Sequence, residues 1–176
     1  MEKYNSIARK LHWTSGLIII SLLIAGFIMT ELPKSAMRNY IYGLHKSFGV
    51  MIILIMLVRI LWKIKSKSPQ LTIAKWQKIS AHITHGLLYI TAVLMPTSGL
   101  LMSISHGYPP NVFGLFTVNF PATSLIKPYA KIFSNTHYYT GWVLTILIAI
   151  HIIAAFSHGF GKNGIIWRMW NKNHNQ

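Results

Sequence analysis

The sequence has no cysteine and no aspartate, and its only acidic residues are Glu2 and Glu31. Without cysteine, the chain has no disulfides, no iron–sulfur cluster, no thiol nucleophile and no site for covalent haem attachment. The lack of acidic side chains within its apolar stretches removes the usual proton relays and cation sites of ion pumps. It also removes the paired carboxylates of most glycosidases.

Charged residues make up 11% of the 176 residues and hydrophobic residues 52%, with a mean hydropathy of +0.42. Soluble chains are about 25% charged, and disordered chains combine high charge with low apolarity, so neither class fits. A formal charge of +15 would suit a nucleic-acid-binding protein. The basic residues are instead spread between long apolar runs. The composition therefore predicts an integral membrane protein that contacts the lipid bilayer and not nucleic acid.

Four apolar stretches are long enough to cross a bilayer as helices, which takes about 20 residues each. They cover residues 11–30, 41–62, 82–104 and 136–160. The connection before the last stretch contains four prolines, which predict that it is not a continuous helix. We therefore expect an all-α fold, in which residues 1–176 form a single transmembrane domain built as an integral membrane four-helix bundle.

The basic residues predict the orientation of the helices, because cytoplasmic ends carry the excess of Lys and Arg. Twelve of the 17 lie in the amino-terminal arm, around the second connection and in the tail. The other side has five: Lys34, Arg38, Lys46, Lys127 and Lys131. Both termini should therefore face the cytoplasm. The first stretch resembles a signal peptide, but it is longer than the roughly 7–15 residues of a signal core, so we interpret it as a retained helix.

Histidine is the main ionisable residue left within the membrane, and the chain has nine copies. A His-x-x-x-Gly pattern begins at His12, His45, His82 and His137. A glycine one turn from a histidine shares its helix face and leaves room for a flat group such as a porphyrin. Small residues also let membrane helices pack closely, but four repeats of the pattern favour the flat group.

His151 lies within an apolar run and has no polar neighbour along the chain. An ionisable side chain at that depth is costly and indicates function. Iron ligation would satisfy one ring nitrogen and leave the other to donate a hydrogen bond; the alternative is a hydrogen bond to another helix. His137 lies 14 residues earlier, close to four turns and about 21 Å of rise. Two histidines on one face at two depths favour two stacked cofactors.

Because successive helices cross the membrane in opposite directions, a second histidine is available at each depth. His45 opens the second helix on the outer side, level with His137, whereas His12 lies toward the inner side, as does His151. Spacing alone leaves another candidate for the inner ligand, because the His82-x-x-His85 segment also starts on the inner side.

Three further histidines have other expected roles. His158 follows His151 by seven residues on the same face, and with His85 it could hold a polar head group at the inner interface or simply anchor the helices there. His106 and His174 lie in a loop and in the tail, where we expect them to be solvated.

Paired histidines in an apolar bundle without cysteine indicate two non-covalent b-type haems. Zinc is the rival metal, but it would need three or four ligands at one depth. No three histidines of this sequence converge so clearly.

Six short motifs follow one another along the chain. They are His12-Trp13, His45-x-x-x-Gly49 with Val58-Arg59, Ala81-His-x-x-His85, Met95-Pro96-x-x-Gly99-Leu100, Phe113-Gly114-Leu115, and His151 followed by His158. Together they resemble the bacterial cytochrome b561 family over essentially the whole chain. Length and motifs are most similar to the branch that contains di-haem superoxide oxidases of bacterial inner membranes. The ordered set is fairly specific to this family.

The resemblance implies a four-helix bundle with two b-type haems between the helices. By position, it implies His12 and His151 as axial ligands of the inner haem iron, His45 and His137 as those of the outer haem iron, and His85 and His158 at a quinone site. In that branch superoxide gives an electron at the outer side and ubiquinone is reduced at the inner side. The catalytic residues are not identified by this resemblance.

Two other functions fit the sequence. One is a cytochrome b subunit that links the quinone pool to a partner dehydrogenase or hydrogenase, which a co-purifying redox protein would favour. The other is a non-redox membrane scaffold or transporter, which a colourless purified protein would favour.

Overall fold

The computed structural model describes residues 3–66, 74–159 and 165–169, without the side chains at positions 158, 159 and 165. Its four long helices are α1 (Ser6–Glu31), α2 (Ala36–Lys65), α3 (Lys75–Ser105) and α5 (Ala130–Gly159). By length and composition, four helices are able to cross a membrane. The all-α, membrane-spanning fold predicted from the apolar stretches is therefore confirmed.

The helices extend beyond the predicted stretches, most clearly at their starts. The Asn5 side chain caps α1 by accepting the Ala8 backbone N–H at 2.8 Å. Ser35 caps α2 in the same way by accepting from the Arg38 N–H at 3.2 Å. Such caps satisfy N–H groups that the first helical turn leaves open. Hydropathy marks the width of the hydrocarbon layer, whereas the caps decide where the helix begins, so the polar first turns were missed.

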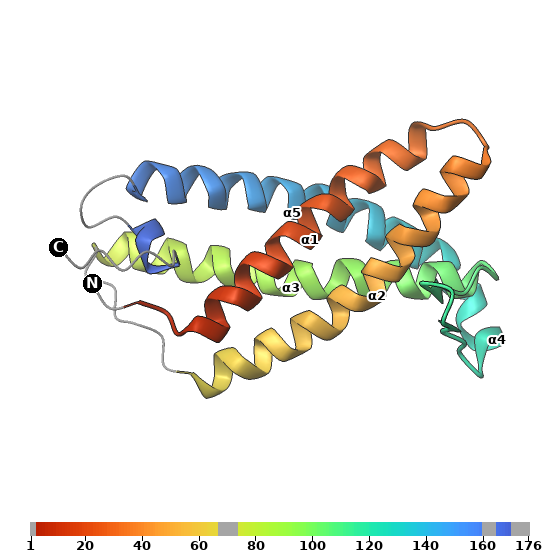
Figure 1. The fold of residues 1–176 in the computed structure, drawn as a ribbon, viewed down its shortest axis with the longest axis horizontal. Coiled ribbons are helices and arrows are strands. Elements are labelled where there is room, and N and C mark those ends of the chain that lie inside the picture. The colour runs from red at the N-terminus through yellow and green to blue at the C-terminus, as the bar shows by residue number, and fades with distance from the viewer. Residues whose placement is uncertain (1–2, 67–73, 160–164, 170–176) are drawn as a thin grey trace.

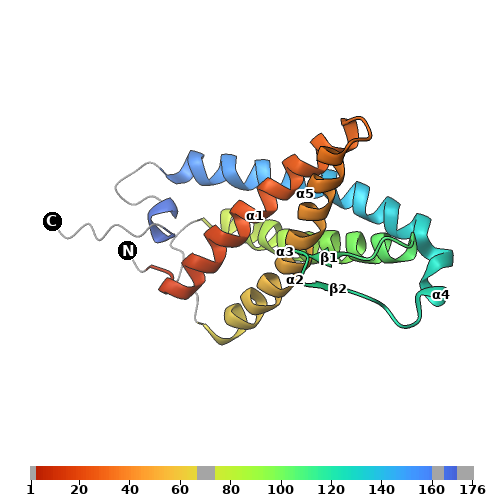
Figure 2. The same cartoon turned by 45° about the vertical axis from the view of Figure 1, so that its right-hand side comes forward.

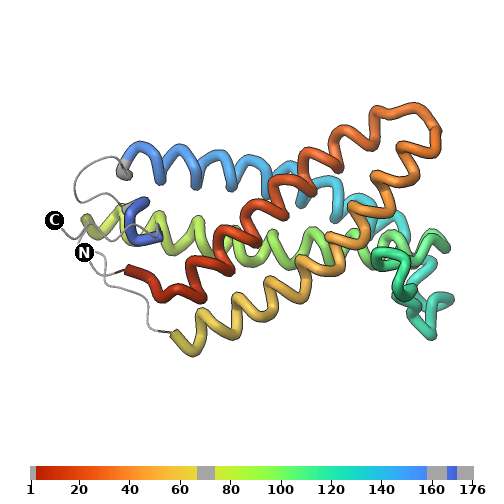
Figure 3. Tube along the Cα trace, in the orientation of Figure 1, coloured from red at the N-terminus to blue at the C-terminus, as the bar shows by residue number. Residues whose placement is uncertain are grey.

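The four helices run alternately up and down. Figure 1 and Figure 2 show α1 and α2 as an antiparallel hairpin that lies obliquely across α3 and α5. The trace in Figure 3 brings the starts of α1 and α3 to the same end of the bundle as the ends of α2 and α5. We call this the terminal end, and the opposite end, at residues 31–36 and 105–130, the loop end.

The connection at the loop end is not a continuous helix, as its prolines predicted. Strands β1 (Asn111–Val112) and β2 (Phe116–Thr117) pair as a short antiparallel hairpin, with Val112 opposite Phe116. The short helices α4 (Thr123–Ile126) and η1 (Lys127–Tyr129) then lead into α5. The hairpin turns at Phe113 and Gly114, both of which have positive φ angles.

Ser47 on α2 holds this hairpin against the bundle. Its hydroxyl oxygen lies 2.8 Å from the Gly43 carbonyl and 3.2 Å from the Asn111 carbonyl, either of which can take its one hydrogen, and it accepts the Phe113 N–H at 3.0 Å. Phe113 also packs edge-on against Phe48, with 5.1 Å between ring centres. Residues more than 60 positions apart in the sequence are thus joined at one side chain that is 2% exposed.

A short turn closes the terminal end. The 3-10 helix η2 (Ile165–Arg168) lies against the start of α1, where the Tyr4 N–H donates to the Arg168 carbonyl at 3.2 Å. The indole N–H of Trp13 donates to the Met169 carbonyl at 2.9 Å. The segment after α5 therefore returns to the first helix.

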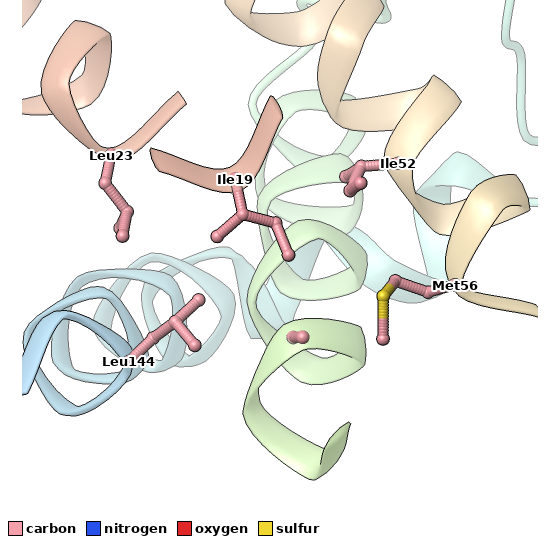
Figure 4. Close-up of a cluster of buried hydrophobic side chains, with 6 residues drawn as sticks. Ile19, Leu23, Ile52, Met56 and Leu144 are labelled. Carbon is pink, nitrogen blue, oxygen red and sulfur yellow. The ribbon is translucent and has the colours of Figure 1, made fainter. Parts of the chain in front are cut away.

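The buried core lies at mid-height between the helices. Its side chains are Ile19, Leu23, Ile52, Met56, Ala92 and Leu144. Figure 4 shows them converging from α1, α2 and α5, with α3 passing among them. Leu144 is 1% exposed and stands seven residues from both His137 and His151. An apolar layer therefore separates the two depths at which α5 carries a histidine.

Candidate functional site

The loop pair consists of His45 on α2 and His137 on α5. Their ring centres are 6.4 Å apart, with an interplanar angle of 89°. Because α2 and α5 both run from the loop end to the terminal end, a histidine near the start of each lies at the same depth. The structure thus brings together the two residues that were expected to share the outer iron.

The terminal pair consists of His12 on α1 and His151 on α5. Their ring centres are 6.2 Å apart, with an interplanar angle of 62°. The antiparallel direction of α1 relative to α5 places an early residue of one helix beside a late residue of the other. The structure therefore brings together the two residues expected at the inner iron.

Both separations fit an iron between the rings. A metal–imidazole bond is about 2.0 Å long, and the ring centre lies about 1.1 Å behind the nitrogen, so two imidazoles on opposite sides of one metal have centres about 6.2 Å apart. The distances of 6.2 and 6.4 Å match this value. Direct hydrogen bonds between the rings would not require this spacing.

The hydrogen bond of His137 orients its ring for ligation. Its Nδ1 donates to the Met95 carbonyl of α3 at 2.8 Å, which leaves Nε2 as the nitrogen with a free lone pair. Haem- and metal-ligating histidines are commonly held in this way. Pro96 lacks the N–H of an ordinary helical residue, so it interrupts the hydrogen-bond ladder of α3 in this turn.

Two glycines give the loop pair its space. A Cβ at Gly99 would lie 2.7 Å from Nδ1 and Cε1 of His137, closer than real side chains approach. A Cβ at Gly26 would lie 3.4 Å from Cε1 of His45. On His45 itself, Nδ1 is buried without a hydrogen-bond partner among the described residues. A buried ring nitrogen without a partner is costly, and coordination of a metal by this nitrogen would remove that cost.

The glycines of the repeated His-x-x-x-Gly pattern border open space. A Cβ at Gly16, Gly49 or Gly86 would meet no atom within 4 Å, apart from its own neighbouring backbone. At Gly141 it would meet only the Met95 methyl group, at an ordinary 3.7 Å. One turn from each of these histidines the helix surface is therefore bare, which fits a flat porphyrin.

His12 also has a cationic neighbour, Arg59. Its Nδ1 is 2.9 Å from a guanidinium nitrogen of Arg59 on α2, and the other terminal nitrogen of Arg59 donates to the Ser15 hydroxyl at 2.6 Å. Because arginine only donates, Nδ1 of His12 accepts, and a neutral ring then carries its proton on Nε2. Ligation through Nε2 moves that proton to Nδ1, and this contact with Arg59 then changes.

His85 lies beside the terminal pair but does not fit the iron spacing. Its ring centre is 5.3 Å from that of His151, which is about 1 Å less than a shared iron requires. His82 is exposed, and its Nδ1 donates to the Lys78 carbonyl at 2.7 Å within its own helix. By distance, His12 is the better partner of His151, and His85 is left as a polar neighbour of the site.

No other histidine side chain of the described residues forms part of either pair. His106 is exposed, and its Nδ1 donates to the Met102 carbonyl at 2.9 Å. The side chain of His158 and all of His174 lie outside the described residues. No group of three or more His, Asp or Glu side chains with a metal-binding arrangement occurs in the part of the chain that the structure describes.

Sequence reasoning missed several residues that shape these sites. Arg59, Ser15 and Met95 were not assigned roles, although Arg59 and Met95 belong to motifs that carried the resemblance. The available signals were an arginine inside an apolar stretch and a Pro-x-x-Gly segment in a helix. Neither signal indicates which histidine the residue contacts.

Comparison with known proteins agrees with this geometry. The sequence profile of the prokaryotic cytochrome b561 family matches residues 3–172. Cytochrome b561 homolog 2 of Escherichia coli (strain K12) is 28% identical over 97% of this chain and 93% of its own length. The probable superoxide oxidase CybB of Yersinia pestis is 25% identical, over 97% of each chain. Cytochrome b561 homolog 1 of E. coli is 25% identical over 96% of this chain and 97% of its own.

The match spans nearly the whole chain, and the two histidine pairs fit the b-type haem that this family binds. The chain belongs to the prokaryotic cytochrome b561 family of membrane electron-transfer proteins.

Proposed function

We propose that this chain is a di-haem cytochrome b that carries electrons across the bacterial inner membrane from superoxide to ubiquinone. The observation that carries the proposal is the presence of two histidine pairs, each with the ring spacing that one iron requires. The apolar layer around Leu144 separates them. Two such sites at different depths form a path from one end of the bundle to the other.

The histidines would hold one haem b at each pair. When bound, haem b supplies an iron that takes up and releases one electron. His45 and His137 would hold the iron at the loop end, and His12 and His151 would hold the iron at the terminal end.

We place the terminal end on the cytoplasmic side. Twelve of the 17 Lys and Arg residues belong to the amino-terminal arm, the region around the second connection and the tail, and cytoplasmic segments carry this excess. Electrons would then enter at the loop end and leave at the terminal end.

Superoxide as the donor is supported by charge at the loop end. The cations Lys34, Arg38, Lys46, Lys127 and Lys131 belong to this end, and such charges attract a small anion by electrostatic steering. The relative from Yersinia pestis is a probable superoxide oxidase. Two superoxide ions would each give one electron and become dioxygen, and ubiquinone would take two electrons and two protons to form ubiquinol.

His85 supports ubiquinone as the acceptor. It lies 5.3 Å from His151 between ring centres, so a quinone head held by His85 would be next to the terminal site. An imidazole can donate a hydrogen bond to a quinone oxygen and pass on a proton. His158 was expected to act with it, and its side chain lies outside the described residues.

Rapid mixing of oxidised protein with superoxide tests the proposal. We expect a b-type spectrum with two haems per chain, reduction of both by superoxide, and reoxidation by added ubiquinone. Haem-free protein is the control for the spontaneous loss of superoxide. Two haems that stay oxidised in superoxide but are reduced by a co-purifying dehydrogenase would contradict the donor and favour the alternative of a subunit in a larger complex.

A further inference from the structure

Arg59 is tied to three groups around the terminal pair. Its guanidinium donates to the Ser15 hydroxyl at 2.6 Å and contacts Nδ1 of His12 at 2.9 Å. The same group lies over the Tyr89 ring, 5.1 Å from its centre. Ser15 is fully buried, so the charge is held between α1, α2 and α3, about six residues or roughly 9 Å from the end of its helix.

Among the described residues, this positive charge has no carboxylate nearby. Glu31 provides the one side-chain carboxylate of the described residues, and it ends α1, 19 residues beyond His12, or about 28 Å along the helix. The next charge on α2 is Lys63, whose ammonium lies over the same Tyr89 ring at 4.2 Å. Arginine stays protonated at any pH that proteins tolerate, so the positive charge of Arg59 beside His12 does not change with pH.

The loop pair lacks an equivalent. Lys46 directly follows His45, but its ammonium is directed to the connection, where it donates to the Tyr108 carbonyl at 3.0 Å. Among the described residues, no cation contacts Nδ1 of His45 as Arg59 contacts Nδ1 of His12. The two sites therefore differ in the positive charge that acts on them.

We propose that Arg59 is a positioning residue that raises the reduction potential of the haem held by His12 and His151. This inference rests on the proposed function, because it requires haem at the terminal pair. A positive charge beside an axial ligand stabilises the iron with the added electron, so it favours transfer from the iron at the loop pair, which is oxidised, to the iron at the terminal pair, which is reduced. Arg59 would thereby direct electrons toward the end where the acceptor binds.

The effect does not depend on the hydrogen bond to His12. When iron takes Nε2, Nδ1 gains the proton and no longer accepts from Arg59. The contacts with Ser15 and Tyr89 still hold the guanidinium beside the site.

Potentiometric titration of the purified holoprotein, followed through its visible haem bands, tests this role. Arg59→Gln should lower the potential of one of the two haems by at least tenfold in the equilibrium constant, about 59 mV for one electron. Arg59→Lys should keep most of the potential. Lys65→Gln, which removes an exposed charge at the end of the same helix, is the matched control and should change neither haem.

His151→Ala identifies the affected haem. This variant should retain only the haem of the loop pair, and adding Arg59→Gln to it should leave the remaining potential within threefold. If Arg59→Gln disturbs haem binding, Ser15→Asp keeps Arg59 and cancels its charge, and it should lower the same potential.

The outcomes separate this inference from the function on which it rests. Wild-type protein without two b haems would refute the proposed function. If the wild type has two haems and the potential of the terminal haem is unchanged in an Arg59→Gln or Ser15→Asp protein that keeps both haems, the role of Arg59 is refuted and the proposed function is not. Equal lowering of both potentials would also refute it, because a local charge acts on the nearer iron.

Discussion

The ring of His137 occupies the space that a side chain on Gly99 would need. A Cβ at this glycine would lie 2.7 Å from both Nδ1 and Cε1 of the imidazole. The same ring donates to the Met95 carbonyl, one turn earlier on α3. Helix α3 therefore supplies both the hydrogen bond that orients this histidine and the gap that admits it.

Gly99→Ala should displace His137 and weaken the haem of the loop pair. The methyl group cannot be accommodated at 2.7 Å without a shift of the ring or of α3. We expect about one haem per chain instead of two, measured by the pyridine haemochrome method against protein concentration. Gly43→Ala is the control, because a Cβ there meets nothing within 4 Å. Full haem content in Gly99→Ala would show that the ring sits elsewhere in the loaded protein.

Replacing one histidine of a pair should remove the haem of that pair. His137→Ala should remove the haem of the loop pair and His151→Ala that of the terminal pair, each leaving one haem, because an iron with one axial histidine is held far less firmly. The exposed His106 supplies the control variant His106→Ala, which should keep two haems. Unchanged haem content in His137→Ala or His151→Ala would rule out the ligand assignment.

His12 and His85 should behave differently. The ring spacing of 6.2 Å from His151 suits His12 as a ligand, whereas 5.3 Å places His85 too close for a shared iron. We therefore expect His12→Ala to lose one haem. His85→Ala should keep both and slow haem reoxidation by ubiquinone at least tenfold in stopped-flow mixing. Loss of a haem in His85→Ala with two haems in His12→Ala would reverse the assignment.

Ser47→Ala should loosen the hairpin at the loop end. The substitution leaves the Phe113 N–H without its acceptor, and an unsatisfied buried group costs about 1–3 kcal/mol. Hydrogen exchange of residues 111–117 should therefore quicken by about tenfold or more, whereas that of α3 should not change. Ser134→Ala serves as a control, because its hydroxyl donates only to Ala130 within its own helix. Equal exchange in both variants would mean that other contacts hold the hairpin.

Local pattern was enough to predict the membrane helices and the depths of the histidines. Transmembrane segments must satisfy their backbone internally, so long apolar stretches such as 136–160 predict helices without knowledge of their neighbours. Helical periodicity likewise placed His137 and His151 on one face of α5. The first turns of the helices, such as Ser6–Lys10, were missed because capping by Asn5 is a local contact that hydropathy does not register.

Contacts between helices were beyond the reach of the sequence. Spacing along the chain separated His12 only weakly from His82 and His85 as the partner of His151, because it gives depth but not the crossing angle of the helices. In the structure, the ring distances to His151 favour His12 over His85. It also brought Arg59 to Ser15 and His137 to Gly99, contacts between residues 38 to 44 positions apart. The sequence by itself determined the kind of protein and the depth of each site, because these depend on local composition and helical period; only packing between helices decided which side chains meet.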